Sequence, residues 1–172
     1  MGATGGYVNT SVANRASFGA RLGGHILDSL LYGLLASAFI IPGAIMVAVG
    51  VKTCAEKVDA ANGADVTCTS SDINGGLLAG GLGILLLGAV IVAIIYLRAL
   101  GTTGQTWGRK IVGVKVVRQQ DGAPLGIGLA FGRTILENIL GNLCLLNYLW
   151  MLWDAEKQTW HDKIVHSVVI KA

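Results

Sequence analysis

The stretch Arg21–Val51 reads RLGGHILDSLLYGLLASAFIIPGAIMVAVGV and has no lysine or arginine after its first residue. This apolar length exceeds the roughly 20 residues that a bilayer-spanning helix needs. Placing the Asp28 carboxylate in hydrocarbon costs about 2.5–3.5 kcal/mol, so this side chain must have a polar partner. Arg21, His25 and Asp28 are spaced four and then three residues apart and share one helical face. We expect either Arg21 or Arg133 to neutralise Asp28.

The composition is that of a membrane protein. Of the 172 residues, 53% are hydrophobic and 13% are charged, and the mean hydropathy is +0.63. These values lie on the membrane side of the averages for soluble proteins. The length predicts one domain, and the net charge of +3 comes without a basic patch for nucleic acid. We therefore expect a lipid bilayer as the environment and no nucleic-acid partner.

Two spans and their flanking charges predict a topology. The first span runs over about residues 21–49, and the second, over about residues 73–97, has no ionisable side chain. The loop 51–72 between them is acidic, whereas basic residues follow the second span. The positive-inside rule places the N-terminus in the cytoplasm and this loop outside. We expect a multi-pass plasma-membrane protein without a cleaved signal peptide, with a mobile tail over residues 1–17 and one membrane domain over residues 18–172.

The outside loop predicts a disulfide, and the second span predicts a close contact between helices. Cys54 and Cys68 lie together in the outside loop and predict a disulfide, with two free thiols as the alternative. Glycines in the second span form a small-residue stripe that lets helices approach closely. We expect this stripe to contact the first span, rather than a second copy of the chain. The stripe consists of Gly76 and Gly80, continued by Gly83 and Gly88.

The second half of the chain mixes strands with an ambiguous apolar region. β-Branched runs over Ile111–Val117 and Ile164–Ile170 predict two strands that pair in one cytoplasmic sheet. Residues 125–153 form either a third span or a helical hairpin that returns to the cytoplasm, and we favour the return. Aromatic residues near its end, including Tyr148 and Trp153, predict an interfacial belt. The predicted fold is an all-α integral membrane protein with two spans, a third embedded region and a small cytoplasmic β-element.

Three charged residues form a set: Arg21 and Asp28 lie in the first span, and Asp162 lies in QTWHD near the end of the sequence. They are similar to the arginine and two aspartates that give the RDD family of small membrane proteins its name. GQTWGRKIVGVKVV (residues 104–117) and HDKIVHSVVI (residues 161–170) resemble further family segments. The resemblance implies a membrane protein linked, in some members, to transport and to cation/proton antiport. Fold and family alone do not assign the function.

Two functions remain open on these residues. In the first, the chain is a transporter or cation/proton antiporter whose ion or proton site comprises Asp28, His25, Glu137 and Arg133. In the second, it is a non-catalytic accessory subunit whose charges hold helices in register. We expect no enzyme activity, metal site or cofactor, and we expect Asp162 to pair with Arg109 or Lys110. The spans show no inverted repeat of the transporter kind, and a homo-oligomer or a larger membrane complex is the expected assembly.

Overall fold

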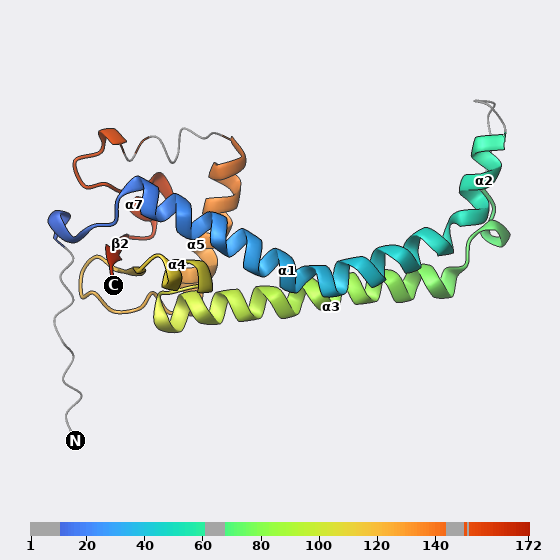
Figure 1. Ribbon diagram of the computed structural model, residues 1–172, viewed down its shortest axis with the longest axis horizontal. Coiled ribbons are helices and arrows are strands. Elements are labelled where there is room, and N and C mark those ends of the chain that lie inside the picture. The colour runs from blue at the N-terminus through green and yellow to red at the C-terminus, as the bar shows by residue number, and fades with distance from the viewer. Residues whose placement is uncertain (1–10, 61–67, 144–149, 151) are drawn as a thin grey trace, which may run out of the picture. The chain divides into compact units, whose positions relative to one another are not determined.

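A computed structural model describes residues 11–60, 68–143, 150 and 152–172 of the chain (Figure 1). The described elements form two compact units. One unit contains the residues up to Leu31 together with Ile94–Ala172, and the other contains Tyr32–Ala93. The elements are, in order, η1 (Val12–Asn14), α1 (Phe18–Gly50), α2 (Lys52–Ala60), η2 (Ser70–Asp72), α3 (Gly75–Arg98), the π-helical turn η3 (Ala99–Thr103), α4 (Trp107–Ile111), β1 (Val114–Arg118), α5 (Ile127–Leu143), α7 (Trp160–Ile164) and β2 (Ser167–Lys171).

Two helices in the described part of the chain are long and apolar enough to cross a membrane. Phe18–Gly50 has a hydropathy of 2.1, and Gly75–Thr103, which comprises α3 and η3, has a hydropathy of 2.7. Their outward surfaces carry exposed large apolar side chains, among them Leu34 and Leu86. Exposed apolar surface of this extent marks a membrane or protein contact. The predicted spans 21–49 and 73–97 coincide closely with these helices.

Within the unit Tyr32–Ala93, α1 and α3 lie side by side (Figure 1). Their contact is made at glycines. A Cβ added to Gly81 would lie 2.7 Å from the carbonyl oxygen of Gly43, and one added to Gly88 would overlap the ring of Phe39. Such close backbone approach is what small residues permit in membrane helices. The glycines of α3 thus contact α1 of the same chain, as we expect from the sequence. Of the predicted stripe, Gly80 and Gly88 have close contacts with α1, whereas a Cβ added to Gly83 would meet no atom within 4 Å. The prediction omits Gly81, which also contacts α1 closely.

The predicted outside loop contains its own helix, α2, and the disulfide. Cys54 and Cys68 are bonded, with their Cα atoms 5.5 Å apart. The Asp72 carboxylate accepts hydrogen bonds from the ammonium of Lys57 and from the backbone and hydroxyl of Thr69. These bonds, the Lys57 bond above all, lower the pKa of Asp72 to about 2. The disulfide and the Lys57–Asp72 ion pair thus connect α2 to the segment before α3.

The two predicted strands do pair, and the chain before α1 joins them. β1 and β2 are antiparallel, with Val116 opposite Val169. Each strand begins three residues later than its apolar run. The first residue of each run ends a short helix (α4 or α7), the second caps that helix, and the third has a positive φ. Arg15 forms a bridge to Ile170, and the N–H of Ala16 donates to the carbonyl of Val169 at 2.9 Å. Arg15 and Ala16, near the end of the expected tail over residues 1–17, are both buried. Residues 1–10 of that tail lie outside the described part.

An internal repeat generates this pairing. QTWGRKIVGVKVV (residues 105–117) and QTWHDKIVHSVVI (residues 158–170) share Q-T-W, K-I-V and the valine at Val116 and Val169. Each copy forms a short helix, a residue with positive φ and a strand. Because equivalent valines face each other across the ladder, a local two-fold axis passes between them. The sequence analysis considers an inverted repeat only among the spans and overlooks this shorter one. The shorter repeat relates the two strands and the short helices before them.

Helix α5 has its apolar side chains outside and its charges inside. Ile127, Phe131 and Ile135, spaced by four residues, are exposed, whereas Arg133 and Glu137 are buried. This arrangement is the reverse of a helix that packs against a core in water. Residues 144–149, which include Cys144 and the predicted belt residue Tyr148, lie outside the described part of the chain.

Candidate functional site

The candidate site is a cluster of buried charges in the unit that contains Ile94–Ala172, and its first member is Asp28. Oδ1 of Asp28 accepts a hydrogen bond of 2.7 Å from the backbone N–H of Gly108, and Oδ2 accepts one from the hydroxyl of Thr106. Nε of Arg109 lies 3.9 Å from Oδ2. A Cβ on Gly108 would overlap the backbone of α1 at Gly24 and Asp28, so glycine is required for this approach. The segment before and within α4 is thus shaped to hold this carboxylate.

The partner of Asp28 is Arg109, so the expectation of Arg21 or Arg133 is wrong. Arg21 lies two helical turns from Asp28 and reaches a different element. Its Nη1 lies 2.7 Å from Oδ2 of Asp162 in α7, and its Nη2 donates to the carbonyl of Lys157 at 2.7 Å. Arg21 and Asp28 therefore do not pair with each other along α1. Arg21 contacts α7, and Asp28 contacts α4.

Asp162 is completely buried and receives donors on both oxygens. Oδ1 accepts hydrogen bonds from Nε and Nη2 of Arg133 at 3.1 and 2.9 Å, and from the hydroxyl of Ser167 at 3.0 Å. Burial raises the pKa of this carboxyl, but the positive charges of Arg133 and Arg21 outweigh burial and hold the pKa well below its ordinary value. The expected pairing of Asp162 with Arg109 or Lys110 is wrong, because Arg21, Arg133 and Ser167 occupy its oxygens, while Arg109 lies beside Asp28 and Glu137.

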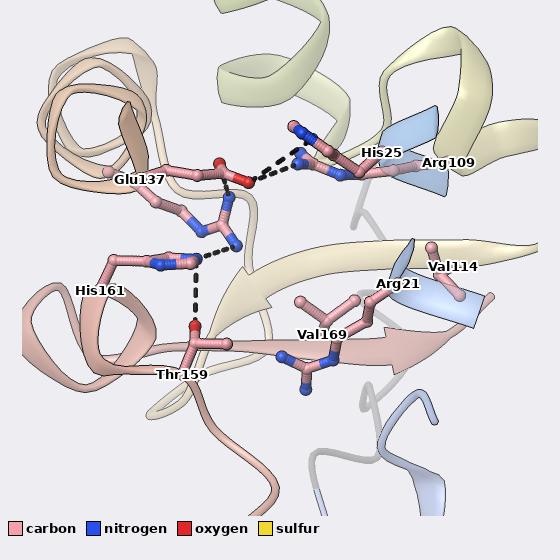
Figure 2. Close-up of a pocket in the computed structure, with 9 residues that line it drawn as sticks. Arg21, His25, Arg109, Val114, Glu137, Thr159, His161 and Val169 are labelled. Atoms are coloured by element: carbon pink, nitrogen blue, oxygen red, sulfur yellow. Dashed lines mark hydrogen bonds and ion pairs between the residues drawn. The ribbon is translucent and has the colours of Figure 1, made fainter. Parts of the chain in front are cut away.

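Glu137 lies between Arg133, which binds Asp162, and Arg109, which lies beside Asp28 (Figure 2). Its Oε2 lies 3.1 Å from Nη1 of Arg133, and its Oε1 lies 3.8 Å from Nη2 of Arg109. Nδ1 of His25 lies 3.9 Å from the same Oε1. The His25 side chain is 48% exposed, whereas the Glu137 side chain is 10% exposed. The structure thus brings His25, Glu137 and Arg133 together, and it adds Arg109 as their link to Asp28.

His161 is a buried member of the cluster. Its Nε2 lies 3.2 Å from Nη2 of Arg133 and 3.0 Å from the hydroxyl of Thr159. Burial, together with the positive charge of Arg133, lowers the pKa of His161 from 6.5 to about 4. The imidazole is therefore neutral at physiological pH.

The formal charges of the cluster balance among the described residues. Its arginines are Arg21, Arg109 and Arg133, and its carboxylates are Asp28, Glu137 and Asp162. The sequence prediction omits Thr106, Gly108 and Arg109 from the site. The signal that identifies them is the internal repeat, since Thr106 and Arg109 occupy the positions of Thr159 and Asp162 in the second copy.

A cavity of about 20 Å³ lies inside this cluster (Figure 2). Both copies of the repeat line it, together with α1 and α5. The lining residues are Arg21, His25, Arg109, Val114, Arg133, Glu137, Thr159, His161 and Val169. Asp28 and Asp162 do not line it.

Comparison with known proteins identifies the family. Residues 15–166 match the RDD family. A 70-residue segment is 36% identical to the proline-rich antigen homolog of Mycobacterium tuberculosis (strain H37Rv) and covers 41% of this chain and 29% of that protein. It is 31% identical to the proline-rich antigen of Mycobacterium leprae (strain TN), where it covers 41% of this chain and 28% of that protein. The chain thus matches less than a third of the length of these relatives.

No solved structure gives a significant match to the chain. The match to the RDD family nevertheless begins at Arg15, the first residue that joins the sheet, and includes Arg21, Asp28 and Asp162. Together with the two long apolar helices, this match shows that the chain belongs to the RDD family of membrane proteins.

Proposed function

We propose that this chain is a non-catalytic membrane subunit in which the charge cluster fastens the cytoplasmic β-element to the membrane helices. The proposal depends on one observation: donors from the chain itself already bind the carboxylates of Asp28 and Asp162. Asp28 is held by Thr106, Gly108 and Arg109, and both oxygens of Asp162 are held by arginines. Buried ion pairs of this kind define a unique packing, although they add little stability relative to apolar residues. A carboxylate bound in this way is not available to a transported cation.

The sheet supports a topology in which both ends of the described chain lie on one side of the membrane. The segment before α1, the strand after α3 and the C-terminal strand are bonded into one small sheet. A hydrogen-bonded sheet of this size cannot straddle a bilayer, so α1 and α3 supply two crossings in a plasma-membrane protein. We assign this side to the cytoplasm because of its basic residues, with the disulfide loop outside. The exposed apolar face of α5 then lies in the lipid as an embedded helix that does not cross.

The partners of such a subunit are the lipid bilayer and either further copies of the chain or a larger membrane complex. We assign no enzyme activity, metal or cofactor to the chain. His161 and Asp162 do not form a catalytic pair in this proposal, since the carboxylate is committed to arginines and the imidazole is buried.

A cation/proton antiporter is the second candidate, and one observation favours it. The half-exposed His25 lies beside the buried Glu137 at the cavity, so a proton can pass from solvent to a carboxylate there. The contacts of Oε1 of Glu137 with His25 and Arg109 are long, at 3.9 and 3.8 Å. In this candidate Glu137, rather than Asp28, is the residue that exchanges protons.

Purification and flux measurements separate the two candidates. For a subunit, the tagged chain extracted in mild detergent retains a stoichiometric companion or self-assembles, and reconstituted vesicles show no cation-driven proton flux. Asp28→Asn then lowers accumulation and loses the assembly, while Asp121→Asn at an exposed ion pair preserves both. Proton flux that disappears in Glu137→Gln, with normal insertion and folding, would instead establish the antiporter and refute the subunit proposal.

A further inference from the structure

The cavity inside the charge cluster has an unbalanced lining, although the cluster as a whole is neutral. Three arginines line it, and Glu137 is the one acidic residue in the lining. The carboxylates of Asp28 and Asp162 are directed elsewhere, toward α4 and toward the guanidiniums of Arg21 and Arg133. Glu137 is itself engaged by Arg133 at 3.1 Å. Among the described residues that line the cavity, guanidinium groups therefore outnumber carboxylates, and Asp28 and Asp162 balance their charge from outside the lining.

Two buried donors among these arginines have no hydrogen-bond partner in the described part of the chain. They are Nη1 of Arg109 and Nε of Arg21. The Arg109 side chain is only 7% exposed, so bulk water does not satisfy its free N–H groups. A buried charged donor without an acceptor is strongly unfavourable. The N–H groups of Arg109, whose side chain lines the cavity, can therefore donate to a small acceptor there.

We propose that the cavity binds one small monovalent anion of halide size. Its volume of about 20 Å³ slightly exceeds the roughly 10–15 Å³ that a single water molecule needs, so a phosphate or a lipid headgroup is too large. An anion accepts hydrogen bonds and donates none, which matches the free Nη1 group of Arg109. The half-exposed His25 lines the same cavity and marks the access from solvent. The anion would lie between the two copies of the repeat and join them.

Chloride binding to the purified full-length chain tests this proposal. In non-ionic detergent, gluconate is replaced by chloride at constant ionic strength, and both the thermal unfolding midpoint and the binding of radioactive chloride are measured. We expect a saturable rise of the midpoint and saturable binding. Arg109→Lys keeps the charge but removes the free Nη1 donor, and we expect it to weaken chloride binding about tenfold, the effect of one lost charge-assisted hydrogen bond. Arg118→Lys, at an exposed ion pair, is the matched control and should bind as the parent does.

A second pair of variants decides the outcome if Arg109→Lys does not fold. Val169→Ile adds one methylene to the cavity wall and leaves every charge in place, so we expect it to abolish chloride binding. Val117→Ile adds the same group at a fully buried strand position away from the cavity and should retain binding. Equal midpoints in chloride and gluconate, which indicate a water molecule only, would overturn the proposal. Chloride binding that survives unchanged in Val169→Ile would overturn it as well.

Discussion

The backbone N–H of Gly108 donates a hydrogen bond of 2.7 Å to Oδ1 of Asp28, across 80 residues of sequence. This bond joins the first long apolar helix to the short helix that precedes β1. It forms only because Gly108 has no side chain at the point where the two backbones meet. Burying the Asp28 carboxylate of α1 in a bilayer is energetically costly. The backbone of Gly108 in α4 and the hydroxyl of Thr106 just before α4 stabilise it.

Gly108→Ala should destabilise the protein, because the added Cβ overlaps the backbone of α1 at Gly24 and Asp28. Forced overpacking of this kind costs about 1–3 kcal/mol, and here it also lengthens the bond to Asp28. Gly132→Ala is the matched control, since a Cβ there meets no atom within 4 Å. Unfolding in detergent, followed by circular dichroism, gives the difference. Equal stability of the two variants would show that α4 does not contact α1 closely.

His161 should make stability depend on pH. Its pKa is lowered to about 4 in the folded protein, against 6.5 for the free side chain, so the unfolded chain binds the proton first. The contribution is complete above pH 6.5 and is lost as the pH falls toward 4, by roughly 3 kcal/mol in total. We expect His161→Gln to remove this component of the pH slope. His166→Asn, at an exposed position in the same copy of the repeat, is the matched control.

The disulfide of the predicted outside loop should be visible on a gel. Reduction of the parent protein should change its mobility, and Cys54→Ser should remove that change. Closing a loop of this length stabilises a chain by roughly 3 kcal/mol in the entropic account, so the variant should also unfold more easily. Cys144→Ser is the control for a cysteine outside the loop. Labelling of both Cys54 and Cys68 by a membrane-impermeant thiol reagent, without prior reduction, would contradict the bond.

Gly81→Ala should weaken the packing of α3 on α1, because its Cβ would lie 2.7 Å from the carbonyl oxygen of Gly43. We expect a loss of about 1–3 kcal/mol, the usual cost of overpacking. Gly83→Ala introduces the same methyl where no atom lies within 4 Å and should be neutral or slightly stabilising. Resistance to unfolding in a denaturing detergent distinguishes the two. If Gly83→Ala proves the more damaging variant, the contact involves a different face of α3.

The two spans were predictable because hydrocarbon imposes a length and a composition that any sequence must display. The strands were predictable for a related reason, since β-branched runs such as Ile111–Val117 favour extended backbone. Their limits were not, because the first residue of each run ends a short helix whose helical state depends on contacts with α1 and α5. The glycine stripe illustrates the same limit, as several glycines of α3 have similar spacing and only the position of α1 selects Gly81 and Gly88.

By itself the sequence determined that Asp28 needs a partner, since the energetic cost of a carboxylate in lipid follows from local composition alone. It also contained the QTW repeat, from which the importance of Thr106 and Arg109 can be inferred. Only the tertiary structure decided which arginine neutralises which acid. An ion pair depends on distances of a few ångströms between side chains, and residues such as Arg21 and Asp162 are brought to 2.7 Å by the antiparallel pairing of β1 and β2 and the packing of α1 and α5 around it.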